Sequence, residues 1–442
     1  MKHLNEISRR KFILTAGATA IVGLGLKGCS TTNSGSQLTA SQAANVNAGG
    51  GNETTKARIG FIGQTDAAPL VIAKVKALFA KHGVPDVELV KQPSWGVTRD
   101  NLQIGSAGGG LDGAMVLSPM PYHMSLGTIT VNNKKLPMYV VARLNTGGQG
   151  ISLGKLYQDT NVGLDASKLK ARVDQERAAG NYLRFAHTFK GGNSDLMLRY
   201  WLAAGGIDPS KDVISLVVPG SQLVPNIRVN NIDGFCVGDP WHVRLINQKL
   251  GYTAFISNEL WQDHPEKALT FRSDWVDRHP NTTKSIVKGL IEAQQWCDKP
   301  ENRLNMATVI SDSEWAKVPV KDVKDRLTGR IDYGNNRPIT ERSPNVMRYW
   351  DNHASYPFKS HDLWFLTENM RWGQLATNID PKQIIDRVNR EDIWRAAAKE
   401  LNLTAAQIPL NTSRGVETFF DGVKFDPANP QAYLNSLKIK QV

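Results

Sequence analysis

The stretch from Pro93 to Asn101 places an aromatic N–H donor and a glycine directly before a helix predicted over residues 98–104. The first amides of a helix have no partner inside the helix, and the helix dipole favours negative charge there. Trp95 adds an indole donor, and Gly96 lets a ligand approach the backbone. This pattern is typical of a pocket for a small anion. A core tryptophan beside a loop glycine is the alternative, and it is the more common arrangement for an isolated stretch of this kind.

Other reactive side chains form no recognisable pattern. The nine histidines are dispersed, and Cys236 and Cys297 lie in apolar surroundings that favour buried free thiols over a disulfide. His187, inside a predicted strand, is interpreted as a core histidine, with His264 a weaker candidate for the pocket. We therefore predict no catalytic residue, no metal site and no cofactor, with an exported enzyme as the alternative class.

The charge balance favours anionic partners. The chain carries a net charge of +12, of which residues 1–28 contribute +4, so the remainder keeps +8. Nucleic acid is excluded as the expected partner because the basic residues are scattered and no Cys/His finger or arginine-rich block occurs. Anionic solutes remain.

Residues 1–28 have the features of an export signal. The basic pair Arg9-Arg10 precedes the apolar run 12–26, which is too short and too rich in glycine for a stable membrane span. Paired arginines indicate the twin-arginine (Tat) route. We expect export to the cell envelope.

Cys29 follows Leu26-Lys27-Gly28 in a sequence similar to a bacterial lipoprotein cleavage site, although the lysine is unusual there. We expect a lipid on Cys29. Residues 29–55 are rich in Ser, Thr, Asn, Gly and Ala without periodicity, which predicts a flexible tether to the membrane.

From residue 56 onward, strands and helices alternate, which predicts an α/β fold. The predicted strands are 57–62, 87–90, 113–117, 138–144, 183–186, 213–218, 234–237 and 268–272. The polar segment 145–150 suits a crossing between lobes. We predict a first lobe over 56–148, a second over 149–245, and a return to the first lobe over 246–442, where aromatic stretches form packed loops wrapped on both lobes.

Four stretches carry a more specific signal, and three others extend it toward the C-terminus. They are 65–69, 94–101, 235–241 and 263–267, and then 356–362, 367–369 and 415–422. Together they resemble the NrtA/CmpA family, the nitrate-binding and bicarbonate-binding lipoproteins of bacterial ABC importers. The resemblance covers about residues 56–440 and is far more specific than a single motif.

The resemblance implies a C-shaped binding protein of the periplasmic type, with two α/β lobes and the anion in the central cleft. Its ligand residues match Trp95 with Gly96, Gln149 and Lys267. A family histidine falls on Ser194, which we interpret as the N-cap of a helix over 195–204. The free amides of that helix would still face the anion.

The residue types favour nitrate, which offers three acceptor oxygens and no donor, so that neutral N–H donors and one cation suit it. Bicarbonate must also donate a hydroxyl proton, and its binders in this family replace the lysine by a carboxylate with a metal ion nearby. Lys267 therefore favours nitrate, with nitrite as a related anion, while Glu266 beside it keeps bicarbonate open as the alternative.

We predict a monomeric solute-binding protein that closes on the anion and docks on the permease of an ABC importer. The chain is not expected to be an enzyme. A nitrate sensor of this fold acting in the cytoplasm is the third alternative, and the export signal argues against it because such a sensor would lack residues 1–28.

Overall fold

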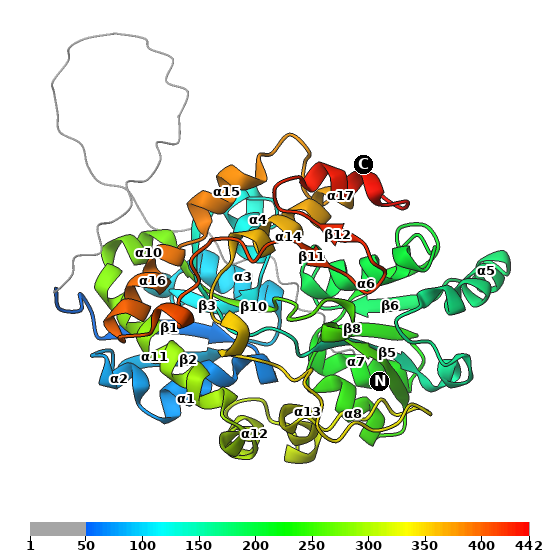
Figure 1. Cartoon of the computed structure of the whole chain (residues 1–442), viewed down its shortest axis with the longest axis horizontal. Helices are drawn as coiled ribbons and strands as arrows, with labels where there is room; N and C mark the ends of the chain where they lie inside the picture. Colours follow the sequence, from blue (N-terminus) through cyan, green and yellow to red (C-terminus); the bar gives the residue numbers. More distant parts are fainter. Residues whose placement is uncertain (1–49, 442) are drawn as a thin grey trace, which may run out of the picture. The chain divides into compact units, whose positions relative to one another are not determined.

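Two five-stranded sheets organise the computed structural model, which describes residues 50–441 (Figure 1). The first has the order β2-β1-β3-β10-β4, with β1 Lys56–Phe61, β2 Asp86–Lys91, β3 Gly113–Leu117, β4 Met138–Arg143 and β10 Lys267–Arg272. The second has the order β7-β6-β8-β5-β9, with β5 Gln149–Gly154, β6 Arg184–His187, β7 Ile214–Val217, β8 Gly234–Gly238 and β9 Gly251–Ile256. The predicted α/β fold is confirmed.

The two sheets share one topology. Three strands are parallel in each, β2-β1-β3 and β7-β6-β8, and the next strand, β10 or β5, is antiparallel to both of its neighbours. Lys267 opens β10 opposite Leu117 at the end of β3, and Gln149 opens β5 opposite Gly238 at the end of β8. Both residues therefore lie at the carboxyl ends of parallel strands, where open α/β sheets bind ligands.

Helices cover the faces of the sheets, which is why the strands β3, β4, β5 and β8 are buried along their whole length. In the first two-thirds of the chain the helices are α1 Ala68–Val75, α2 Leu78–Lys81, α3 Trp95–Ile104, α4 Met120–Leu126, α5 Lys170–Ala178, α6 Asn193–Ala204, α7 Gly220–Arg228, α8 Trp241–Asn247, α9 Ser257–Leu260, α10 Ser273–Arg278 and α11 Pro280–Asp298. As the apolar spacing predicts, Ile286, Leu290, Ala293 and Cys297 form the buried face of α11.

Two helices start earlier than the sequence predicts. Helix α3 begins at Trp95 because Ser94 caps it, its Oγ accepting a hydrogen bond from the Val97 amide at 3.3 Å. Helix α6 begins at Asn193 after the N-cap Gly192, so Ser194 is its second residue and the predicted N-cap role is wrong.

Strand β9 shifts the boundary between the lobes. Residues 246–442 were predicted to return to the first lobe, but residues 251–256 pair with β5 in the second sheet. The sequence of residues 251–256 has no feature that distinguishes a strand of the second sheet from a segment that crosses to the first lobe. The second lobe therefore includes β9, and the chain crosses back between β9 and β10.

The C-terminal third is helical where packed loops were predicted. It contains α12 Arg303–Ser311, α13 Lys324–Thr328, α14 Lys359–Arg371, α15 Pro381–Val388, α16 Glu391–Glu400, the short strands β11 Glu417–Thr418 and β12 Lys424–Phe425, and α17 Pro430–Ser436. Aromatic residues of this part are buried, as predicted, but residues 362–365 lie inside α14.

Helix α14 contacts both lobes, and the orange and red C-terminal helices run along both sheets in Figure 1. In the first lobe, Asp362 forms a fully buried ion pair with Arg143 of β4. On the second lobe, the Asn369 side-chain amide donates to the Gly191 carbonyl at 3.2 Å. The C-terminal segment therefore joins the two lobes in addition to the crossing segments.

Residues 50–55, the end of the predicted tether, contact the folded unit. The Glu53 carboxylate accepts hydrogen bonds from the amides of Asn281 and Thr282 at 3.0 and 2.9 Å, at the start of α11. This satisfies free amides of that helix. The predicted export signal, Cys29 and most of the tether lie outside the described residues.

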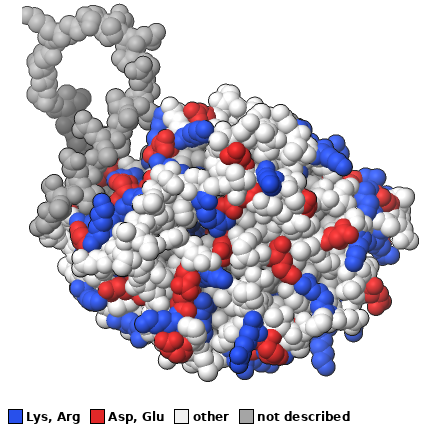
Figure 2. Space-filling view, in the orientation of Figure 1, with Lys and Arg blue, Asp and Glu red and all other residues white. Residues whose placement is uncertain are grey.

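Within residues 50–441 no helix is long and apolar enough to cross a membrane. On the face shown in Figure 2, basic and acidic side chains are intermixed. The basic side chains on this face are thus interspersed with acidic ones and do not form one continuous patch.

Candidate functional site

Trp95 lies where the two lobes meet. It is the first residue of α3 and only 3% exposed, and it lines a pocket of about 130 Å³. The opposite wall comes from the second lobe and includes Thr188, Gly220 and Trp241. Gly96 follows with open space beside it, since a Cβ built there would have only Ser94 Oγ within 4 Å, at 3.9 Å. An anion could therefore approach the free amides of the first turn of α3.

Lys267 lies behind this tryptophan and is buried. Its Nζ is 5.6 Å from the centroid of the Trp95 ring, within the range of a cation–π contact. The same ammonium forms an ion pair with the neighbouring Glu266 and another with Asp66 Oδ2 at 3.5 Å. The lysine that the family resemblance assigns to the site thus already has two carboxyl partners.

Gln149 reaches the same cluster from the second lobe. Its Nε2 donates to Glu266 Oε1 at 2.8 Å, and Lys267 is bonded to that same oxygen. Gly238, opposite Gln149 in the sheet, leaves the room for this, because a Cβ built there would lie 2.8 Å from Asp66 Oδ2 and 3.6 Å from Lys267 Nζ. A glycine is therefore required at this point of contact between the lobes.

Ser194 is buried at the edge of this group and has other partners. Its Oγ accepts from the Thr188 amide at 3.2 Å and lies 3.0 Å from the Thr188 hydroxyl. Its neighbour Asn193 donates to the carbonyls of Pro265 and Glu266 at 3.1 and 2.7 Å. The start of α6 therefore holds the backbone that presents Glu266 and Lys267.

Electrostatics in the cluster are dominated by burial. Burial raises the pKa of Glu266 to about 7, with Lys267 acting to lower it and Asp66 to raise it further. Burial likewise raises the pKa of Asp66, against the opposing effect of Lys267. The two carboxyl groups raise the pKa of Lys267 although burial alone would lower it, so the lysine stays charged.

Three participants were not predicted as site residues. Asp66 and Glu266 fall inside the stretches that carry the family resemblance, but nothing local to either shows that they converge on Lys267. Trp241 presents an indole Nε1 that is buried without a hydrogen-bond partner, and its residue lines the pocket. An aromatic N–H in a Gly-Asp-Pro-Trp turn after a buried strand was the available signal.

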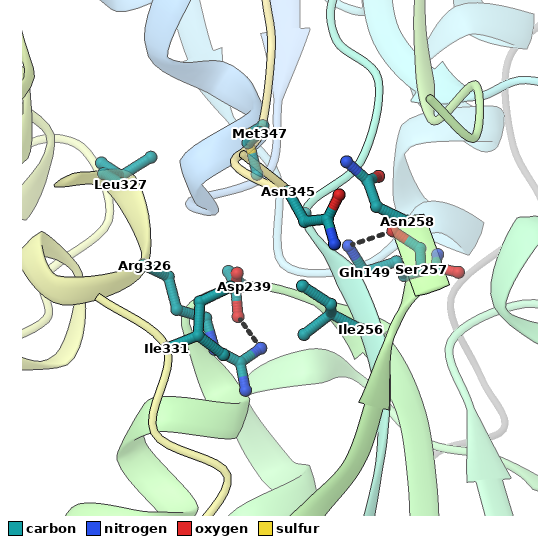
Figure 3. A pocket seen from close by; sticks show the side chains of 11 residues that line it. Gln149, Asp239, Ile256, Ser257, Asn258, Arg326, Leu327, Ile331, Asn345 and Met347 are labelled. Atoms are coloured by element: carbon teal, nitrogen blue, oxygen red, sulfur yellow. Dashed lines mark hydrogen bonds and ion pairs between the residues drawn. The ribbon is translucent and has the colours of Figure 1, made fainter. Parts of the chain in front are cut away.

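A second, much smaller pocket of about 10 Å³ is lined by Gln149 of the second lobe (Figure 3). The Gln149 amide donates to Ser257 Oγ at 3.3 Å, and Arg326 forms an ion pair with Asp239 at 2.9 Å. Arg326 also donates to Thr253 Oγ1 of β9 at 2.8 Å. The backbone carbonyl of Asp239 in turn accepts from the Thr65 amide of the first lobe at 3.2 Å. This pocket is thus bordered by contacts that join the lobes.

Two histidines and two cysteines singled out in the sequence, His187, His264, Cys236 and Cys297, are buried outside the Trp95 pocket. His187 pairs with Asp195 at 3.4 Å and is buried, as predicted for a core histidine. The ring of His264 lies against Trp261 and Trp364 rather than in the pocket, and burial lowers its pKa to about 3. Cys236 and Cys297 are free and buried, which confirms the interpretation as free thiols. Among residues 50–441 no three His, Cys, Asp or Glu side chains are grouped to hold a metal ion.

Comparisons with known proteins agree with the sequence resemblance. The NMT1-like family model matches residues 50–311. The nitrate/nitrite binding protein NrtA of Nostoc sp. is 50% identical, over 99% of this chain and 100% of that protein. The bicarbonate-binding protein CmpA of Synechococcus elongatus is 41% identical over 100% of both chains.

A solved structure extends the agreement to the fold. The crystal structure of the periplasmic nitrate-binding protein NrtA from Synechocystis matches with a TM-score of 0.86 and 53% identity, over 88% of this chain and 100% of that one. These similarities run through both lobes and through the C-terminal segment. The chain therefore belongs to the NMT1-like family and, within it, to the group of NrtA and CmpA binding proteins.

Proposed function

We propose that this protein captures nitrate, and nitrite as the related anion, in the cleft between its lobes and delivers it to the permease of an ABC importer. One observation carries the proposal: Lys267 Nζ, which lies 5.6 Å from the centroid of the Trp95 ring, and Gln149 Nε2 converge on a single oxygen, which is Glu266 Oε1 in this structure. A cation and a neutral N–H donor directed at one oxygen are what an acceptor-only anion requires. The NrtA relatives support the same ligand.

No chemical step on the ligand is needed. The relatives are binding proteins, and the proposed ligand set is Trp95, Gly96, Gln149 and Lys267. Ser194 supports the site from behind through Thr188 rather than as a direct donor. We expect the protein to act as a monomer and without a cofactor.

Bicarbonate is the second candidate because of Glu266. The Oε2 atom of this residue is buried without a hydrogen-bond partner, and a carboxylate oxygen could accept the hydroxyl proton of bicarbonate. A relative of this chain, CmpA, is a bicarbonate-binding protein, which supports bicarbonate as the second candidate. Lys267 and the higher similarity to NrtA favour nitrate.

Calorimetric titration of the mature protein with nitrate, nitrite and bicarbonate, each with and without calcium, tests the choice. We expect heat of binding from nitrate with no added metal. Bicarbonate binding in the absence of any response to nitrate would overturn the proposal.

We further propose that the protein works at the outer face of the inner membrane. The export signal in residues 1–28 and Cys29 support Tat export and a lipid anchor. Fractionation tests this: wild-type protein should sediment with membranes, and Cys29→Ala should appear in the soluble periplasmic fraction. A Cys29→Ala protein that is cleaved and still membrane-bound would contradict the anchor.

A further inference from the structure

Glu266 occupies the donors that the proposed ligand needs. Its Oε1 accepts from Gln149 Nε2 at 2.8 Å and is ion-paired with Lys267 Nζ. The point at which these two donors converge is thus occupied, and a nitrate oxygen could take that point only by replacing this carboxylate oxygen. The Glu266 carboxylate therefore occupies the position that we expect the bound nitrate to take.

The charges of the cluster make this occupation conditional. Glu266 and Asp66 are both fully buried, and Lys267 is the one cation that contacts them among the described residues. With both carboxyl groups ionised, the cluster carries a net negative charge, and a further anion in it would be repelled. With one carboxyl group protonated, the cluster is neutral.

The groups that face Glu266 come from several elements. Lys267 adjoins it in β10, Asp66 faces it from the turn after β1, and the Cys236 thiol faces it from β8. Beyond them, His264 lies near Lys267, and Asp239 lies near Asp66. Burial raises the pKa of the Cys236 thiol well above its usual value and lowers that of His264 to about 3, so both are neutral near pH 7.

We propose that the ionised Glu266 carboxylate competes with the captured anion for Lys267 and Gln149, so that anion binding is coupled to the uptake of one proton by Glu266. The protonated carboxyl group no longer attracts the ammonium and leaves it to the ligand. This rests on the proposed function and adds a pH-dependent determinant to the same site.

The sign of the pH dependence follows from linkage. Burial raises the pKa of Glu266 to about 7 in the ligand-free protein, and a bound anion beside Lys267 raises it further. Affinity for nitrate is therefore constant below about pH 7 and falls above it, by about tenfold per pH unit while only the bound form retains the proton. Asp66 titrates in the same cluster, so the transition belongs to the coupled pair.

The test is a set of nitrate titrations at pH 6, 7, 8 and 9 on wild type and Glu266→Gln. Wild type should lose about tenfold in affinity per pH unit from 7 to 9. Glu266→Gln removes the charge, so its affinity should stay constant over this range and exceed that of wild type at least tenfold at pH 8. A pH-independent wild type, or an unchanged slope in Glu266→Gln, would overturn the inference.

Two further variants separate the roles of the carboxyl groups. Asp66→Asn should keep the slope but begin it at lower pH, because the charge that raises the pKa of Glu266 is gone. If Asp66→Asn abolishes the slope and Glu266→Gln keeps it, Asp66 is the competitor and the inference is wrong. Glu368→Gln is the matched control, since Glu368 is equally buried but pairs with Arg371 in α14, and the wild-type slope should remain.

A measurement on wild type alone covers the case of a variant that fails to fold. Calorimetry at pH 8 in two buffers of different ionisation enthalpy should show uptake of up to one proton per nitrate. No proton uptake with clear nitrate binding would overturn the inference and leave the proposed function intact. No nitrate binding at any pH would instead overturn the proposed function.

Discussion

The two lobes contribute different chemistry from the same position in the same topology. In each sheet the strand antiparallel to its neighbours opens on a site residue at the carboxyl ends of the parallel strands: Lys267 in β10 and Gln149 in β5. The first lobe presents a cation with carboxyl partners there. The second lobe presents a neutral amide there, and its Thr188 and Trp241 line the pocket beside Trp95.

This difference teaches how the site divides its work. In the proposed site, we expect the charge in the first lobe to determine whether an anion is admitted, because burial makes each unpaired charge costly. We expect the neutral donors in the second lobe to determine how well the anion fits once the lobes meet, since such hydrogen bonds contribute only about 0.5–1.5 kcal/mol each. Substitutions in the two lobes should therefore differ in magnitude and in pH dependence.

The largest effect is expected from Lys267→Ala. Loss of a charge-assisted hydrogen bond, which contributes about 1.5–3 kcal/mol, should weaken nitrate binding by about one to two orders of magnitude. The variant also leaves Glu266 and Asp66 without their cation, so the free energy of unfolding should fall by about 3–5 kcal/mol. Titration calorimetry and urea denaturation measure the two effects.

Lys284→Ala is the control for removing a buried lysine. Lys284 is 4% exposed and pairs with Glu400 on the outer side of α11. Its loss should leave nitrate affinity unchanged. Equal nitrate affinity of folded Lys267→Ala and wild type would show that Lys267 does not bind the anion. It would also show that the charge of the first lobe does not control anion binding.

A smaller loss of nitrate affinity is expected from Gln149→Leu, which removes a neutral hydrogen-bond donor and keeps a side chain of similar volume. Nitrate affinity should fall by about fivefold, as for a neutral hydrogen bond of about 1 kcal/mol whose partner is left unmet. The decrease of affinity above pH 7 should persist, because Glu266 and Lys267 remain. Loss of the pH slope in Gln149→Leu, measured by titration at pH 6 and 8, would contradict the division between the lobes.

Trp241→Phe removes the unpartnered indole donor and keeps a large aromatic ring. If Nε1 donates to the bound anion, affinity should fall by about two- to tenfold, in line with a bond of about 0.5–1.5 kcal/mol. The thermal unfolding midpoint should change little. An affinity equal to that of wild type in the same titration would assign the indole to packing alone.

The smallest effect on binding is expected from Ser194→Ala. The Thr188 amide loses its acceptor, so the free energy of unfolding should fall by about 1 kcal/mol while nitrate affinity stays within about twofold of wild type. Denaturant unfolding and calorimetry on one preparation give both values. A loss of affinity without a loss of stability would make Ser194 a direct ligand.

Much of the two sheets could be predicted, because most of their strands carry their own apolar periodicity, but β5 and β9 were not predicted and the C-terminal helices were predicted as loops. Predicted strand 113–117 coincides with β3, and Trp95 lies at the pocket as its stretch suggested. The start of α3 was missed because Trp95 and Gly96 are weak helix formers, and the cap on Ser94 outweighs that preference.

The charge cluster could not be predicted from local pattern. Asp66 and Lys267 are brought together only when β10 inserts beside β3, which is a property of strand order rather than of either sequence stretch. Residues 251–256 were assigned to the first lobe and were not predicted as a strand for a related reason, since a short apolar segment does not reveal which sheet edge it joins. Pairwise contacts between distant segments are the part of the site that periodicity does not encode.

Helix α14 has a mechanical consequence. Its N-terminal half is tied to β4 by the buried Asp362–Arg143 pair, and near its C-terminal end Asn369 is bonded to Gly191 ahead of α6. A hinge that rotated about the crossing segments alone would have to pull this rod away from one of its two attachments. The contacts of α14 therefore oppose separation of the two lobes. A substitution in α14 could change how readily the pocket opens, although α14 is distant from Trp95 in the sequence.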